Sequence, residues 1–134
     1  MAFINWSKTY SVGIKKIDNQ HQKLFKMINN FHVYVQKGDP QAPKKLLIQL
    51  MDYALVHFQT EEKYFKQYNY PESKAHIKEH LEFEKRISTF RSNYQSKKTL
   101  NATLMLNYIK KWIVNHILII DKKYSRYFHD HGLQ

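Results

Sequence analysis

The 134-residue sequence contains no cysteine and only three glycines and three prolines. Without cysteine the chain can form no disulfide, zinc knuckle or iron–sulfur cluster, and it has no thiol nucleophile. The scarcity of glycine and proline favours long helices, because these two residues are the usual chain breakers. No apolar run reaches 18 residues, and the first 16 residues lack the apolar segment of an export signal. We therefore expect a cytoplasmic protein with no membrane partner.

Acidic residues are also scarce, since 11 Asp and Glu face 22 Lys and Arg, which gives a formal net charge of +11. This charge permits binding to nucleic acid or to an anionic surface. The lysine pairs, however, are spread along the whole chain and do not form one block. We interpret them as solvated helix faces and expect no specific nucleic-acid partner. The length suits a single domain spanning residues 1–134.

Chain breakers at residues 38–43, 69–71 and 96–101 divide the sequence into four segments. Within each segment apolar residues recur at steps of three and four, which is the period of one helix face. The pattern predicts an all-α, up-down-up-down four-helix bundle. Residues 1–14 carry aromatic side chains without a helical period and are expected to form an extended N-terminal arm. The predicted helix N-caps are Asp18, Ser73 and either Thr99 or Asn101.

Seven potential metal ligands lie on the apolar faces of these segments: His21, His57, Glu61, His76, His80, His116 and Asp121. Two pairs among them are spaced i, i+4, so each pair projects from one side of its helix. Asp121 follows His116 by five residues, about 140° around an α-helix, and would have to reach sideways. One histidine on an apolar face is usually a hydrogen-bonded core residue. A buried, unpaired carboxylate such as Glu61 is costly, however, and two cations would remove that cost.

Imidazole and carboxylate ligands without sulfur suit iron, although manganese, cobalt and zinc are chemically possible. A rival interpretation uses the string His76-Ile77-Lys78-Glu79-His80, which matches the H-x-x-E-H pattern of inverted zinc peptidases with Glu79 as the general base. That interpretation leaves the remaining predicted ligands without a purpose. The other histidines have no partner at ligand spacing and are expected on the surface: His32, His129 and His131.

The order and spacing of these residues resemble the bacterial hemerythrins over nearly the whole chain. The matching parts are Ile17-Asp18-Asn19-Gln20-His21, His57-Phe58-Gln59-Thr60-Glu61-Glu62, His76-Ile77-Lys78-Glu79-His80, and the stretch from Trp112 through His116 and Asp121 to Tyr124. The resemblance implies a non-haem di-iron centre with an oxo or hydroxo bridge. In that family pattern His76, His80 and His116 bind one iron, and His21 and His57 bind the other. Glu61 and Asp121 bridge the two.

The resemblance also implies a ligand pocket beside the iron that has two histidines. It maps onto five apolar residues, which as ordinary core residues would be buried in any case: Leu24, Phe58, Trp112, Ile113 and Ile117. The function implied is reversible O2 binding for delivery, storage or sensing, with azide and other small anions as competitors and without enzymatic activity.

Three alternatives stay open: a di-iron peroxidase or nitric-oxide-handling enzyme, an iron reservoir, and a nucleic-acid-binding bundle with structural metals. The enzymatic alternative needs a more open pocket or a proton donor such as a tyrosine. The sequence predicts no particular protein partner.

Overall fold

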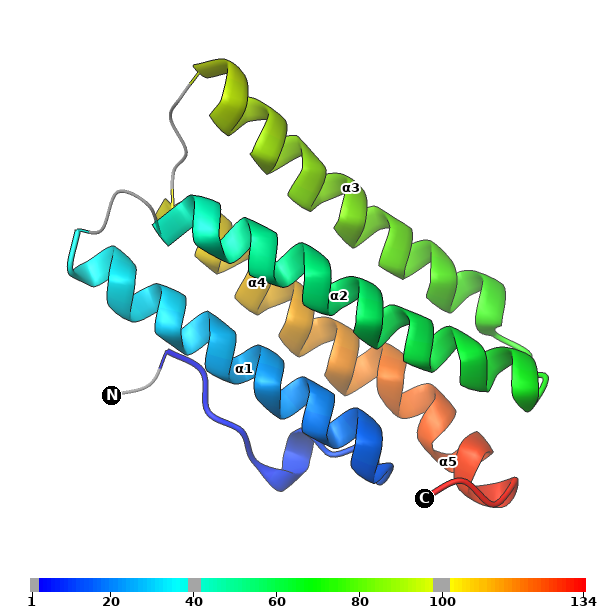
Figure 1. The fold of residues 1–134 in the computed structure, drawn as a ribbon. Helices are drawn as coiled ribbons and strands as arrows, with labels where there is room; N and C mark the ends of the chain where they lie inside the picture. Colours follow the sequence, from blue (N-terminus) through cyan, green and yellow to red (C-terminus); the bar gives the residue numbers. More distant parts are fainter. Residues whose placement is uncertain (1–2, 39–41, 98–101) are drawn as a thin grey trace.

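The computed structural model describes residues 3–38, 42–97 and 102–134, and these residues form an up-down-up-down helical bundle (Figure 1). Its first three helices are α1 (Lys15–Gln36), α2 (Ala42–Gln67) and α3 (Ser73–Lys97). The fourth antiparallel segment is continuous but composite, with α4 (Ala102–Asn115), the π-helix η2 (His116–Asp121) and α5 (Lys122–Asp130). The prediction of an all-α bundle is therefore confirmed.

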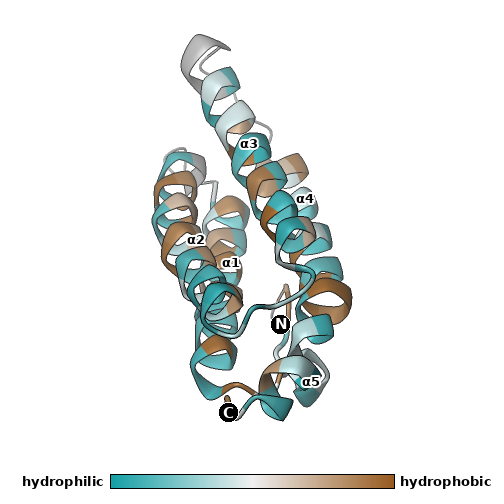
Figure 2. Ribbon diagram, turned by 90° about the vertical axis from the view of Figure 1, so that its right-hand side faces the viewer, coloured by the Kyte–Doolittle hydropathy of each residue, from teal (hydrophilic) through white to brown (hydrophobic). Residues whose placement is uncertain are grey.

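The core lies along the axis of the bundle, where all four helices contribute apolar side chains. Ile28 of α1, Leu50 of α2, Ile87 of α3 and Ile109 of α4 are completely buried. Hydropathy varies along each ribbon in short apolar and polar stretches, as expected of amphipathic helices (Figure 2). Among the described residues, no helix combines the length and apolar character needed to cross a membrane.

The N-terminal arm is extended, as predicted, apart from one 3-10 turn, η1 (Lys8–Tyr10). It packs through aromatic rings, because Trp6 and Tyr10 lie with their centroids 5.4 and 4.9 Å from that of Phe25 on α1. The arm thereby packs against α1, and its own Ile4 and Val12 are buried.

The predicted helix caps are largely wrong. α1 begins at Lys15, so Asp18 lies in its first turn and not at the N-cap. The Asp18 carboxylate instead accepts hydrogen bonds from the Ser11 hydroxyl at 2.5 Å and the Val12 amide at 2.8 Å, which fastens the arm to the helix. Ser73 is the first helical residue of α3 and not its cap. Thr99 and Asn101 lie outside the described residues.

Candidate metal centre

The fold brings all seven predicted ligand residues together in the bundle interior. Each helical segment contributes at least one of them: His21 from α1, His57 and Glu61 from α2, His76 and His80 from α3, and His116 and Asp121 from η2. None of these residues is more than 3% exposed. Seven ionisable groups in the core require a strong compensating interaction, because burial of unpaired charge is expensive.

The π-helix explains how Asp121 joins the cluster. Hydrogen bonds from residue i to i+5 widen the helix, so residues five apart come to lie nearly above one another. His116 and Asp121 are the first and last residues of η2, and His116 Nε2 lies 2.9 Å from Asp121 Oδ1. The expectation that Asp121 would reach sideways from a regular α-helix is therefore wrong, because the backbone itself turns this carboxylate inward.

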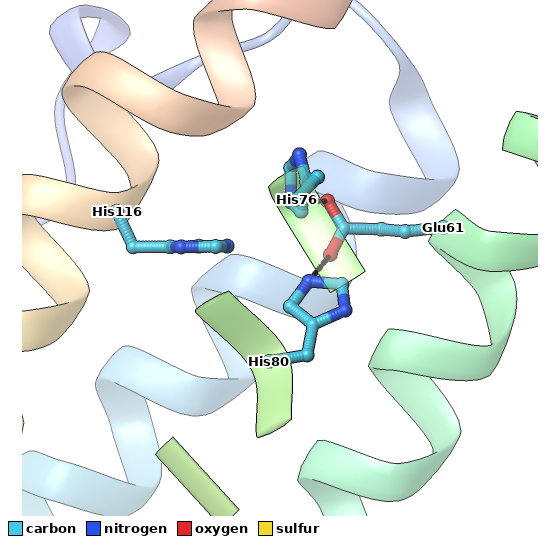
Figure 3. A group of neighbouring side chains, drawn as sticks. All are labelled: Glu61, His76, His80 and His116. Atoms are coloured by element: carbon cyan, nitrogen blue, oxygen red, sulfur yellow. Dashed lines mark ion pairs between the residues drawn. The ribbon is translucent and has the colours of Figure 1, made fainter. Parts of the chain in front are cut away.

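The cluster divides into two sets of converging atoms, and within each set the ligand atoms lie within 4.8 Å of one another. The first set consists of Glu61, His76, His80 and His116 (Figure 3). In it, His80 Nε2 lies 3.0 Å from Glu61 Oε1.

The second set consists of His21, His57, Glu61 and Asp121. In it, His21 Nε2 lies 3.0 Å from Asp121 Oδ2, and His57 Nε2 lies 3.2 Å from Glu61 Oε1. Glu61 belongs to both sets, and Asp121 Oδ1 also approaches His76 Nε2 to 3.0 Å. One set thus offers three imidazoles, the other offers two, and the two carboxylates lie between them.

These separations fit two metal ions better than a hydrogen-bond network. For metal–ligand bonds of about 2.1 Å, two ligand atoms at right angles lie about 3.0 Å apart, close to the separations found here. Several of the same atoms, including His80 Nε2 and both Asp121 oxygens, have no hydrogen-bond partner of suitable geometry among the described residues. His21 Nε2 and His57 Nε2 face each other at 3.1 Å. Converging donor atoms of this kind are the usual arrangement around a cation.

The pKa values of the buried ligands in the metal-free polypeptide show how strongly these groups interact. Burial acts to raise the pKa of Asp121, but the imidazoles of His116, His21 and His76 hold it well below its usual range. Burial acts to lower the pKa of His57, but Glu61 raises it above the ordinary value. In the absence of a metal, the cluster therefore holds ionised carboxylates and draws protons onto part of its imidazoles.

A second layer of polar groups orients the imidazoles and one carboxylate. His57 donates its Nδ1–H to Gln20 Oε1 at 2.7 Å, and His80 Nδ1 lies 3.1 Å from Glu62 Oε2. Tyr124, itself completely buried, donates its hydroxyl to Glu61 Oε2 at 2.5 Å. Such contacts set which ring nitrogen is free to bind a metal.

The sequence argument assigned no role to Gln20, Glu62 or Tyr124. The available signal was their position, since Gln20 precedes His21 and Glu62 follows Glu61 directly. Neighbours in sequence on a helix point in different directions, however, so their partners become identifiable only once the facing helix is placed.

The five predicted pocket residues also come together. They line a small cavity beside His21, His57 and His116: Leu24, Phe58, Trp112, Ile113 and Ile117. Two of them stack on imidazoles of the cluster, Phe58 on His80 with centroids 3.8 Å apart and Trp112 on His116 at 4.3 Å. These aromatic rings fix imidazole planes and at the same time form the cavity wall.

The other histidines lie outside the cluster: His129 and His131 are exposed as predicted, whereas the surface position predicted for His32 is not borne out. His32 is half-buried and stacks on Phe3, while His129 Nε2 contacts the Gly13 carbonyl at 2.7 Å. His131 stacks on Tyr127. The peptidase interpretation gains no support, because His76 and His80 converge with the other five ligands.

Comparison with known proteins identifies the family. A family model described as the hemerythrin HHE cation binding domain matches residues 12–128. The bacteriohemerythrin of Pseudomonas aeruginosa (strain LESB58) is 34% identical over 124 residues, covering 92% of this chain and 80% of that protein. That of Clostridium acetobutylicum is 33% identical over 128 residues, covering 89% and 96%. A wild-type hemerythrin crystal structure matches with a TM-score of 0.87 at 25% identity, covering 93% and 97%. The chain therefore belongs to the hemerythrin family.

Proposed function

We propose that this protein binds O2 reversibly at a carboxylate-bridged di-iron centre. In this proposal His76, His80 and His116 hold one iron, His21 and His57 hold the other, and Glu61 and Asp121 bridge them with an oxo or hydroxo group. The division into a three-imidazole and a two-imidazole set supports this assignment. The set with fewer imidazoles leaves a coordination position open to a ligand, as functional metal sites do.

The observation that carries the proposal is the cavity beside His21 and His57. Its volume is about 10 Å³, which is at the lower limit for one water molecule. When bound, the two irons supply the electrons that O2 accepts on binding and returns on release. The apolar wall disfavours water and charged reactants at that position, whereas neutral O2 loses little on entering it. Competition by small anions such as azide stays an expectation of the family resemblance.

The same cavity favours a carrier over an enzyme. Apart from the three imidazoles, the described residues that line it are apolar, so none of them can supply protons to a bound ligand. The buried tyrosine of the site, Tyr124, contacts Glu61 instead. Burial and the nearby Asp121 and Glu61 raise the pKa of Tyr124 well above its ordinary value, so its proton stays on the hydroxyl. We therefore propose a non-enzymatic role in O2 delivery, storage or sensing in the cytoplasm.

Metal content and O2 titration test the proposal together. Elemental analysis of the iron-loaded protein should give two irons per chain, and anaerobic reduction followed by O2 titration should give a reversible change in visible absorption. His76→Ala should lose iron, whereas His32→Ala should retain it. One metal per chain would contradict the di-iron centre itself. Repeated consumption of peroxide by the wild type would contradict the carrier proposal and favour the peroxidase alternative.

A further inference from the structure

A second pocket, of about 90 Å³, lies on the His76 side of the cluster. The start of α3 and the η2–α5 junction form its walls. Its charged lining consists of Glu72, Glu79 and Lys123, and Tyr70 and Ile120 complete the wall around His76. The pocket therefore differs sharply from the apolar cavity beside His21, because it presents two carboxylates and one ammonium group.

His76 connects this pocket to the metal centre. It lines the pocket, yet only 2% of the residue is exposed. Its Nε2 lies 3.0 Å from Asp121 Oδ1 inside the cluster. Neither ring nitrogen of His76 has a hydrogen-bond partner among the described residues. A buried imidazole, whose Nδ1 has no hydrogen-bond partner among the described residues, thus separates the acidic pocket from the other ligands of the cluster.

The carboxylates of this pocket stand out against the charge of the whole protein. With a net charge of +11, the molecule repels cations at long range. Glu79 is nevertheless half-buried beside His76, and Glu72 accepts a hydrogen bond from the Tyr70 hydroxyl at 3.2 Å. Carboxylate and imidazole are ligands that Fe²⁺ accepts readily in exchange for water.

The apolar cavity offers no such exchange. An Fe²⁺ ion that passed Leu24, Ile113 and Ile117 would lose its water without gaining oxygen ligands, which is strongly unfavourable. A neutral diatomic molecule loses little by the same passage. The acidic pocket therefore suits the entry of Fe²⁺, and the apolar cavity suits the entry of a neutral diatomic molecule.

We propose that the pocket formed by Glu72, Glu79 and His76 is the entry site for Fe²⁺. The ion exchanges part of its water shell for the two carboxylates and then passes His76 to reach the buried ligands. This inference rests on the proposed metal centre but not on O2 binding.

The test is the rate at which iron-free protein takes up a ferrous salt under anaerobic conditions, followed by stopped-flow absorption. The variant Glu72→Gln/Glu79→Gln should load roughly tenfold more slowly than wild type, because it loses local steering of the cation. Its final iron content should still be two per chain. The matched control is Glu82→Gln/Glu84→Gln on α3, which changes the net charge equally but lies outside the pocket. The control should load within about twofold of wild type.

Two further readings sharpen the test. Lys123→Gln should accelerate loading, because it removes the ammonium group of the pocket. High salt should shrink the difference between the pocket variant and wild type, since it screens the carboxylates. Thermal melts of the iron-free variants verify that they are folded.

The entry-site proposal would be wrong if the pocket variant loaded iron at the wild-type rate, or if the control variant were slowed equally. A lower final iron content in the pocket variant would also contradict it, because Glu72 or Glu79 would then be a permanent ligand. Failure of wild-type protein to take up Fe²⁺ at all would instead refute the metal centre itself.

Discussion

At the scale of single residues, we expect the wall of the apolar cavity to determine how long a reduced di-iron site lasts before it is oxidised. Ile117 is 1% exposed and Leu24 is 8% exposed, and both face the two-imidazole set. A hydroxyl at either position would hold water near the ligand and provide a proton. Substitutions in the wall can therefore test whether the wall protects the iron from oxidation, because they leave the metal ligands and initial O2 binding in place.

We expect Ile117→Thr and Leu24→Ser to bind O2 initially but to oxidise to the ferric form faster than wild type. The matched control is Ile119→Thr, two residues along η2, where the side chain is 53% exposed. Hour-scale visible spectra measure the oxidation, and melts check for the stability loss of roughly 1–3 kcal/mol that a buried hydroxyl brings. Unchanged oxidation in both folded variants would refute the protected-carrier proposal.

Gln20 is the residue whose role was hidden in the sequence. It accepts the Nδ1–H of His57 and donates its own amide to Thr60 Oγ1 at 3.1 Å, so it holds His57 with Nε2 toward the cluster. Gln20→Ala should weaken iron binding by roughly 10- to 100-fold, as loss of such orienting contacts does. The exposed Gln22→Ala on the same helix should leave it unchanged. Competition with a chelator measures both, and equal affinities for the two variants would exclude a positioning role.

At the scale of helices, the periodicity of apolar residues predicted the four helical segments and their order but not the π-helix. The apolar spacing located all four segments, because steps of three and four hold in the regular helices on either side of η2. The interruption was signalled by a single detail, the five-residue spacing of His116 and Asp121. Spacing alone could not decide between a sideways reach and a widened helix, since that choice depends on where the other three helices place their ligands.

The π-helix yields a prediction about local stability. His116 and Asp121 are the first and last residues of η2, so metal ions bound to them would hold both ends of the π-helix. Without them, the less favourable π geometry loses its main support. Hydrogen exchange followed by mass spectrometry should show that iron removal accelerates exchange more in residues 116–121 than in residues 46–56 of α2. Uniform acceleration along the chain would instead mean that the metals support the bundle as a whole.

At the scale of the whole molecule, we expect bound metal ions and the folded bundle to stabilise each other. The ligands come from four helical segments, so binding of iron requires the assembled fold and adds to its free energy of unfolding. The sequence predicted this coupling because burial and metal ligation fall on the same helix faces. It could not predict the acidic pocket, whose lining brings the start of α3 next to the η2–α5 junction.

The dependence of this coupling on pH follows from the imidazoles. Carboxylates of the cluster raise the pKa of His57 and His76 against the effect of burial, whereas burial lowers the pKa of His21. A histidine with a raised pKa stabilises the folded iron-free chain below its unfolded value of about 6.5 and loses that contribution as the pH rises. The raised pKa values of His57 and His76 therefore act to make the iron-free protein less stable as the pH rises above about 6.5, and the lowered pKa of His21 acts in the opposite direction.

Iron binding has the opposite dependence, because the ion displaces protons from the same imidazoles. The stability gap between ferrous and iron-free protein should widen with pH by about 1.4 kcal/mol per unit for each proton displaced. Anaerobic thermal melts of both forms at pH 6, 7 and 8 measure that gap, with an Ile119→Thr sample to show that a surface change does not alter it. A gap that stays constant would mean that the imidazoles are already neutral before the metal arrives, and a gap that narrows would exclude them as the ligands.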